Sequence, residues 1–162
     1  PGRMVKSNPH NHWVNYCKGA LDGAAFLADL GAIGKFREYV DGFYSTDTGK
    51  VELAEAIADG IHGFGFALAC DFLKELGYTD YVKPDVHLKA ISEGLGLCNG
   101  TDLSTYRAVV AMARDVGESP YAVDKALWLI GSGKLYLDDE GFSTDRDEFI
   151  RVARKAIKTA TP

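Results

Sequence analysis

Apolar residues along this chain recur with the spacing i, i+3, i+4, i+7, which is the period of a helix with one buried face. The pattern is clearest in the sets of four residues named next, and two shorter segments, around Phe26–Leu30 and Leu88–Leu95, also follow it. The clearest sets are Trp13/Tyr16/Cys17/Ala20, Phe36/Tyr39/Val40/Phe43, Ala54/Ile57/Ala58/Ile61, Phe66/Ala69/Cys70/Leu73, Tyr106/Val109/Val110/Ala113, Val123/Ala126/Leu127/Ile130 and Phe149/Val152/Ala153/Ala156. The pattern predicts about nine short helices and no strand, and therefore an all-α fold.

Capping residues support this division into helices. Ser119-Pro120 has the form of an N-cap followed by proline at the first helical position. Four glycines each follow an apolar run, as C-cap glycines do; they are Gly31, Gly77, Gly96 and Gly117. Because no repeat, low-complexity tract or linker divides the chain, we expect a single domain over residues 1–162.

The composition fits a folded intracellular protein. With 162 residues, of which 46% are hydrophobic, the chain can bury a core without disulfides or metal. Cys17, Cys70 and Cys98 are odd in number and far apart, so we expect reduced thiols, no iron–sulfur cluster and no structural zinc. The absence of a long apolar run and of a signal-peptide pattern predicts a cytoplasmic protein with no membrane partner, nucleoid-associated if the source is bacterial.

Charge is unevenly distributed along the chain. The formal net charge is -5, and the stretch from Asp138 to Glu148 accounts for all of it, so that the rest is balanced and a local positive groove remains compatible with the sequence. In the last predicted helix, four basic residues fall at i, i+3, i+4, i+7, away from the apolar face; they are Arg151, Arg154, Lys155 and Lys158. This face is interpreted either as solvated or as a contact for phosphates.

The segment Ile61-His62-Gly63-Phe64-Gly65, here called the glycine turn, permits two interpretations. A dinucleotide-binding turn would need a buried strand before the first glycine, whereas Val51–Asp59 has helical spacing and is rich in Ala and Glu. The alternative is two helices joined by a tight turn, with glycine where the backbone turns sharply or another body approaches closely. The unpaired amides at the start of the second helix would then form an anion site suited to a DNA phosphate.

Together with the residues downstream, the turn resembles the helix-hairpin-helix DNA glycosylase superfamily. The members of that superfamily share an apolar residue, Gly-apolar-Gly, an alanine-bearing second helix, and a catalytic aspartate in an Asp-x-His segment about 20 residues further on. The matching residues here are Ile61, Gly63, Phe64, Gly65, Ala69, Asp85 and His87. The resemblance covers roughly Val51 to Leu97, and the remaining predicted helices are compatible with the same fold.

The resemblance implies base excision, in which a damaged or modified nucleotide is flipped out of duplex DNA and its N-glycosidic bond is hydrolysed. Asp85 would be the catalytic carboxylate, because the sugar develops oxocarbenium character as the base leaves and a carboxylate stabilises that charge. Gly63, Phe64 and Gly65, with Lys83 and His87, would contact DNA phosphate. No organic cofactor is implied; a monovalent cation on the backbone carbonyls of Asp59, Ile61 and Phe64 is implied by relatives.

Departures from the superfamily pattern also carry information. Bifunctional members have an attacking lysine where this chain has Ala67, and Lys74, the nearest lysine on that helix, is expected at the surface. The sequence therefore predicts a monofunctional enzyme. His62 replaces the usual proline and keeps a backbone N–H. The chain is shorter than many members, so an N-terminal element that shapes the base pocket is expected to be missing or reduced.

Several residues have structural alternatives to these roles. The glycine turn could be an ordinary turn between helices, and Asp85 after Pro84 has the form of an N-cap. Tyr78 and Tyr81, in the loop before Asp85, are the candidates for stacking on a flipped base, because this loop is expected to expose them. Core packing is expected for Trp13, Trp128 and Phe66, and Asp124 is expected to interact with the helix dipole. For Lys83 and Lys89 the alternatives are a solvated position and a phosphate contact. For His87 they are a hydrogen-bonded structural role and a phosphate contact. The rival functions are a non-enzymatic DNA-binding module and a helical protein-interaction domain.

Overall fold

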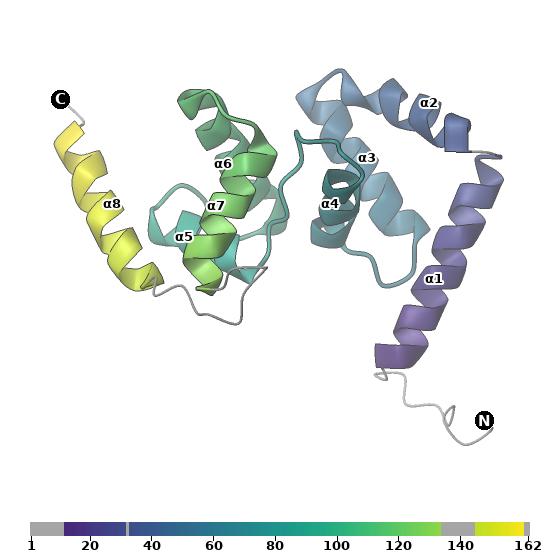
Figure 1. The fold of residues 1–162 in the computed structure, drawn as a ribbon, viewed down its shortest axis with the longest axis horizontal. Coiled ribbons are helices and arrows are strands. Elements are labelled where there is room, and N and C mark those ends of the chain that lie inside the picture. Colours follow the sequence, from purple (N-terminus) through teal and green to yellow (C-terminus); the bar gives the residue numbers. More distant parts are fainter. Residues whose placement is uncertain (1–11, 32, 134–144, 161–162) are drawn as a thin grey trace. The chain divides into compact units, whose positions relative to one another are not determined.

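The computed structural model describes residues 12–31, 33–133 and 145–160. Within these residues the chain forms eight helices and no strand, which confirms the predicted all-α fold. Packing contacts divide the chain into two units, Pro1–Ala69 and Cys70–Pro162 (Figure 1). The prediction of one domain over residues 1–162 stays a prediction. Asp138, Asp139 and Glu140 of the acidic stretch lie outside the described residues.

The first unit contains α1 (His12–Asp29), α2 (Ile33–Tyr44) and α3 (Asp47–Gly60), and α1 and α2 each pack against α3. Thr46 caps α3, since its hydroxyl accepts the Gly49 N–H at 2.9 Å. The Phe26 ring of α1 meets Tyr39 of α2 edge to face, with centroids 5.9 Å apart. The buried apolar side chains come mainly from α2 and α3: Phe36, Val40, Val51, Leu53, Ala54, Ile57 and Ile61.

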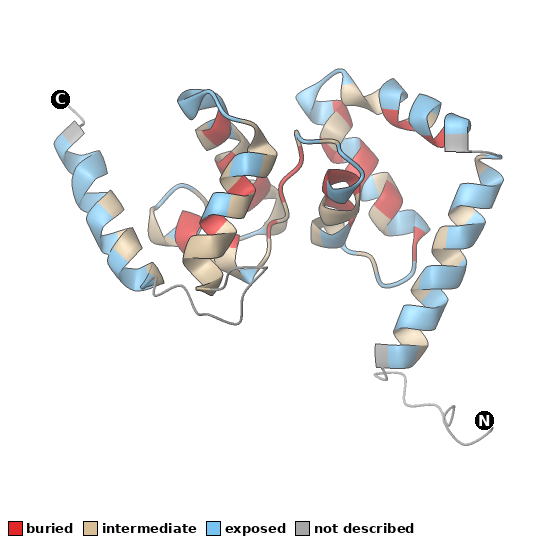
Figure 2. Cartoon of the chain, viewed as in Figure 1, coloured by how far each residue is buried: buried red, intermediate tan, exposed pale blue. Residues whose placement is uncertain are grey.

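The second unit contains the last residues of α4 (Phe66–Glu75), then α5 (Val86–Gly94), α6 (Asp102–Val116), α7 (Pro120–Ser132) and α8 (Arg146–Ala160). Helices α5, α6 and α7 pack together, and α8 lies beside α5 and α7. Buried side chains gather on α4, α5, α6, α7 and the segment that leads into α5 (Figure 2). They include Cys70, Leu73, Tyr81, Val82, Leu88, Ile91, Tyr106, Val109, Ala113 and Leu127.

The predicted caps are confirmed. All four expected C-cap glycines adopt positive φ, with values of 92° at Gly31, 98° at Gly77, 78° at Gly96 and 73° at Gly117. Ser119 caps α7, because its hydroxyl accepts the Ala122 N–H at 3.1 Å and Pro120 occupies the first helical position.

Helix α1 covers two of the predicted segments, so the nine expected helices become eight in the described chain. Gly19 lies inside the first apolar set and Gly23 between the two sets, and neither residue ends the helix. They let α1 approach the residues that follow α3 instead, since a Cβ on Gly19 would lie 2.8 Å from the His62 carbonyl oxygen. Trp13, for which core packing was predicted, is 74% exposed on this helix, so that prediction is wrong.

The buried faces of α7 and α8 differ from the predicted ones. In α7 the buried residues are Asp124 and Leu127, whereas Ala126 is exposed. In α8 the half-buried residues include Phe149, Ile150 and Ala153, whereas the predicted Val152 and Ala156 are exposed. Both faces are therefore rotated relative to the prediction. In α7 a polar residue takes the place of an apolar one in the core.

Candidate functional site

The residues before Asp85 form a non-helical, largely buried segment. Tyr81, Val82 and Pro84 are buried, and the Tyr81 ring lies against Tyr106 of α6 with centroids 6.2 Å apart. The Asp85 N–H donates to the Lys83 carbonyl at 2.7 Å, which closes a tight turn around Pro84. The segment is therefore held in place by core packing and by backbone hydrogen bonding up to the aspartate.

Asp85 caps α5, so the capping alternative is confirmed. Its Oδ1 accepts the N–H groups of His87 at 2.9 Å and Leu88 at 3.1 Å. Both bonds use the same oxygen, and among the described residues Oδ2 has no hydrogen bond or ion pair. The side chain is half-buried. The cap thus fixes the orientation of the carboxylate and leaves one oxygen available to a further partner.

His87 packs against α7. Its ring meets Trp128 edge to face, with centroids 6.2 Å apart, and its Cβ lies close enough to Gly131 that a side chain there would approach it at 2.7 Å. The Nδ1 atom is buried without a hydrogen-bond partner. The ring is therefore packed as the structural alternative for His87 expects, but Nδ1 lacks the hydrogen bond that this alternative includes.

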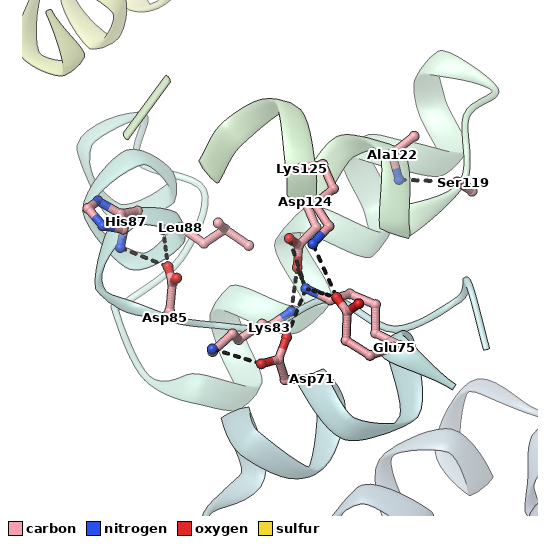
Figure 3. A network of polar contacts seen from close by, with 11 residues as sticks. Asp71, Glu75, Lys83, Asp85, His87, Leu88, Ser119, Ala122, Asp124 and Lys125 are labelled. Atoms are coloured by element: carbon pink, nitrogen blue, oxygen red, sulfur yellow. Dashed lines mark hydrogen bonds and ion pairs between the residues drawn. The ribbon is translucent and has the colours of Figure 1, made fainter. Parts of the chain in front are cut away.

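A buried polar cluster lies beside the same segment (Figure 3). The Lys74 and Asp124 side chains are 3% and 2% exposed, and the Lys74 Nζ lies 3.2 Å and 3.3 Å from the two carboxylate oxygens of Asp124. Asp124 Oδ2 also accepts the backbone N–H of Lys83 at 2.5 Å. Asp124 therefore ties α7 both to α4 and to the segment that carries Asp85.

Asp71 completes this cluster at its more exposed side. Its two oxygens lie 3.1 Å from the Lys74 Nζ and 2.8 Å from the Lys83 Nζ. Partial burial opposes ionisation of Asp71, but the hydrogen bonds and charges of the two lysines hold its pKa below the ordinary value. Burial raises the pKa of Asp124, and Lys74 with the Lys83 amide offsets only part of that rise.

The cluster borders a polar cavity of about 250 Å³ in the second unit. Acidic and basic side chains line it together with one aromatic ring; the lining residues are Asp71, Lys74, Glu75, Lys83, Asp124, Lys125 and Trp128. Trp128, which lines this cavity, also contacts the ring of His87, two residues after Asp85. The cavity is therefore close in structure to the α5 cap.

Sequence reasoning missed most of this cluster. Lys74 was predicted at the surface and Asp124 as a simple dipole contact, and both are wrong because the two side chains pair inside the core. The available signal was the position of Asp124 three residues before the buried Leu127, on the same helix face. Lys83 is half-buried and its Nζ pairs with Asp71, so its charge already has a partner.

The two stacking candidates differ. Tyr81 is fully buried against Tyr106, so the prediction that this loop exposes it is wrong. Tyr78 is half-buried. Phe66, expected in the core, is also only half-buried.

The glycine turn lies in the first unit. Gly63 has φ +81°, a left-handed conformation that favours glycine, and the Phe64 N–H donates to the Ile61 carbonyl at 3.0 Å. The N–H that His62 retains donates to Asp22 Oδ2 of α1 at 3.2 Å. Helix α4 begins at Phe66, so the turn joins two helices as predicted.

The start of α4 differs from the starts of α3, α5, α6 and α7, each of which has a side-chain cap. Gly65 occupies the cap position: its carbonyl accepts the Ala69 N–H at 3.0 Å, and it has no side chain to accept from the first amides. The first turn of α4 contains no acidic residue. A Cβ at Gly63 or Gly65 would meet no atom within 4 Å, so the backbone is open to a close approach at both positions.

No family model, curated protein or solved structure matches this chain. In the described part of the chain, none of the helices combines the length and the apolar character that crossing a membrane requires. Likewise, the residues described contain no group of three or more His, Cys, Asp or Glu side chains that could hold a metal ion. The three cysteines are free thiols: Cys17 is exposed, Cys98 half-buried and Cys70 buried.

Proposed function

We propose that this protein is a monofunctional DNA glycosylase, which hydrolyses the N-glycosidic bond of a damaged or modified base flipped out of duplex DNA. The observation that carries the proposal is the state of Asp85: its carboxylate is oriented by two amides through Oδ1, while Oδ2 has no partner among the described residues. Capping the helix uses only Oδ1, which accepts both amides. The second oxygen is the one that can act on a substrate.

In the proposed reaction the bond between the sugar C1′ and the base nitrogen breaks, and its electron pair leaves with the base. Positive charge then develops on the sugar, and Asp85 Oδ2 stabilises it electrostatically. The same oxygen orients a water molecule, whose oxygen bonds to C1′ and whose proton passes to the carboxylate and on to solvent or the departing base. The products are a free base and an abasic site.

The glycine turn is the proposed contact for DNA phosphate. Since Gly65 cannot cap α4 with a side chain, the positive end of the helix dipole at the start of α4 is the proposed site for an anion. The Asp22 carboxylate, bonded to the His62 N–H, fixes the other side of the turn. A monovalent cation on the Asp59, Ile61 and Phe64 carbonyls is compatible with this geometry, because the Ile61 oxygen, which accepts from Phe64, keeps a second lone pair.

The proposal of a monofunctional enzyme rests on the residues of α4. Ala67 has no amine that could attack the sugar. Lys74 is 3% exposed and paired with Asp124 and Asp71, so its amine is held away from solvent as an ammonium partner of two carboxylates. Strand cleavage through a Schiff base is therefore not expected.

The second candidate is a DNA-binding module without catalysis. It is favoured by the burial of Tyr81, which leaves Tyr78 as the remaining aromatic residue proposed for stacking near Asp85. In this case the glycine turn would still bind phosphate, and Asp85 would serve only as a cap.

A panel of duplexes separates the two candidates. The protein is incubated with duplexes that carry uracil, alkylated, deaminated, oxidised or hypermodified bases; free base is measured, and strands are tested for breaks before and after hot alkali. The glycosylase predicts release of base, with breaks only after alkali. Breaks without alkali contradict the argument from Ala67. Binding without release from any duplex favours the module.

A further inference from the structure

Helix α8 presents a set of cations that have no acidic partner in the part of the chain that the structure describes. Arg154, Lys155 and Lys158 are exposed, and none of their side chains forms an ion pair or hydrogen bond with another described residue. Arg151, one turn earlier, is neutralised by Glu148, whose Oε2 lies 2.7 Å from the arginine Nε. Together with Asp147 and Ile150, these four basic side chains line an open groove of about 460 Å³.

This arrangement contrasts with the rest of the described chain, where most lysines are neutralised locally. Six lysines on other elements lie within 4.0 Å of a carboxylate oxygen. The pairs are Lys35–Glu38, Lys50–Asp47, Lys74–Asp124, Lys83–Asp71, Lys89–Asp102 and Lys125–Glu75. Although the chain has a net charge of -5, three neighbouring cations on one helix have no acidic partner among the described residues.

The other face of α8 is occupied. Phe149, Ile150 and Ala153 are half-buried where the helix packs on α5 and α7. Ile150 contacts α5 so closely that a Cβ on Gly94 would lie 2.7 Å from its Cδ1. These three apolar side chains are therefore engaged by the protein, while most of the helix surface faces solvent (Figure 2).

We infer that the basic face of α8 binds the phosphate backbone of duplex DNA, as a contact surface additional to the glycine turn. The choice of duplex DNA among polyanions rests on the proposed function. Between residues 154 and 158 the helix rises about 6 Å, which matches roughly two nucleotide steps, and therefore three successive phosphates, of one DNA strand. Three cations at this spacing can each neutralise a phosphate and release a counterion.

The test measures binding to an unmodified duplex, by fluorescence anisotropy over a series of salt concentrations. The variant carries Arg154→Gln, Lys155→Gln and Lys158→Gln, which remove charge from exposed positions only. The matched control is Arg107→Gln, an exposed arginine on α6. Helical content and thermal unfolding are recorded for each protein, because cations near a helix C-terminus also interact with the helix dipole.

Each phosphate contact contributes about 0.9 to the slope of log affinity against log salt. The triple variant is therefore expected to lose about 2 to 3 from this slope, whereas Arg107→Gln keeps the wild-type slope. A triple variant that binds like the wild type overturns the inference for α8 and leaves the proposed function standing. No salt-dependent binding by the wild type, or binding to vesicles with anionic lipid but not to DNA, also overturns it. If binding depends on α8 but no duplex of the panel releases a base, the surface stands and the proposed catalysis fails.

Discussion

The pairing of Lys74 with Asp124 makes a strong prediction about stability. Replacing Asp124 with alanine leaves the Lys74 ammonium, 3% exposed, without its buried partner, and leaves the Lys83 N–H without its acceptor at 2.5 Å. Removing one member of a buried pair costs about 3–5 kcal/mol. Because Asp71 stays 3.1 Å from the Lys74 Nζ and is itself partly exposed, we expect a loss near the lower end, about 3 kcal/mol.

Urea unfolding followed by far-UV circular dichroism at neutral pH measures this loss. Asp124→Asn keeps an oxygen for the Lys83 amide and should cost less, about 1–2 kcal/mol. The double variant with Lys74→Met and Asp124→Leu should be less destabilised than the sum of its single variants, because neither charge is then left alone. Asp115→Ala, on the exposed face of α6, is the matched control and should unfold like the wild type. An Asp124→Ala variant as stable as this control would refute the assignment of a structural ion pair.

Three further predictions concern titration, the glycine turn and the thiols. Since burial raises the pKa of Asp124, the folded state keeps this proton to higher pH than the unfolded chain. The unfolding free energy of the wild type relative to Asp124→Asn should therefore fall as pH rises above about 4, and it should level off beyond the folded pKa. Urea titrations in which this free energy rises with pH would mean that the attraction of Lys74 outweighs desolvation. Gly63→Ala should cost about 1–2 kcal/mol of stability because φ at Gly63 is +81°. Gly65→Ala should cost much less, because φ at Gly65 is not positive and a Cβ there meets no atom within 4 Å; equal losses in thermal unfolding would contradict the turn geometry. Burial raises the pKa of the Cys70 thiol, so an aromatic disulfide reagent should label the exposed Cys17 in the native protein and Cys70 only after unfolding, as peptide mapping can check.

The helices and their ends could be predicted from the sequence because their causes are local. Gly117 and Ser119 act within a few residues of their own positions, and the structure shows both as expected. The extent of α1 could not be predicted in this way, because Gly19 serves a contact with His62, which is distant in sequence. A glycine that permits close packing has the same local pattern as one that ends a helix.

The polar core illustrates a second limit. Asp124 and Lys74 are 50 residues apart, and a periodic pattern of apolar residues cannot show that two charged residues meet inside the fold. Tyr81 escaped prediction for a related reason, since it lies outside any helix and is buried by its contact with Tyr106. The capping role of Asp85 was predictable, because Asp after Pro is a local signal at a helix start.

The proposal depends most directly on the carboxylate of Asp85, and single-turnover base release from the best duplex of the panel tests it. Asp85→Asn preserves the cap, because asparagine also accepts the amides of His87 and Leu88. Asp145→Asn is the matched control, since Asp145 Oδ1 accepts the N–H groups of Asp147 and Glu148 with the same geometry at the start of α8. The account predicts that Asp85→Asn abolishes release while DNA binding and thermal stability are retained, and that Asp145→Asn releases base at the wild-type rate. Release by Asp85→Asn at the wild-type rate would contradict the account.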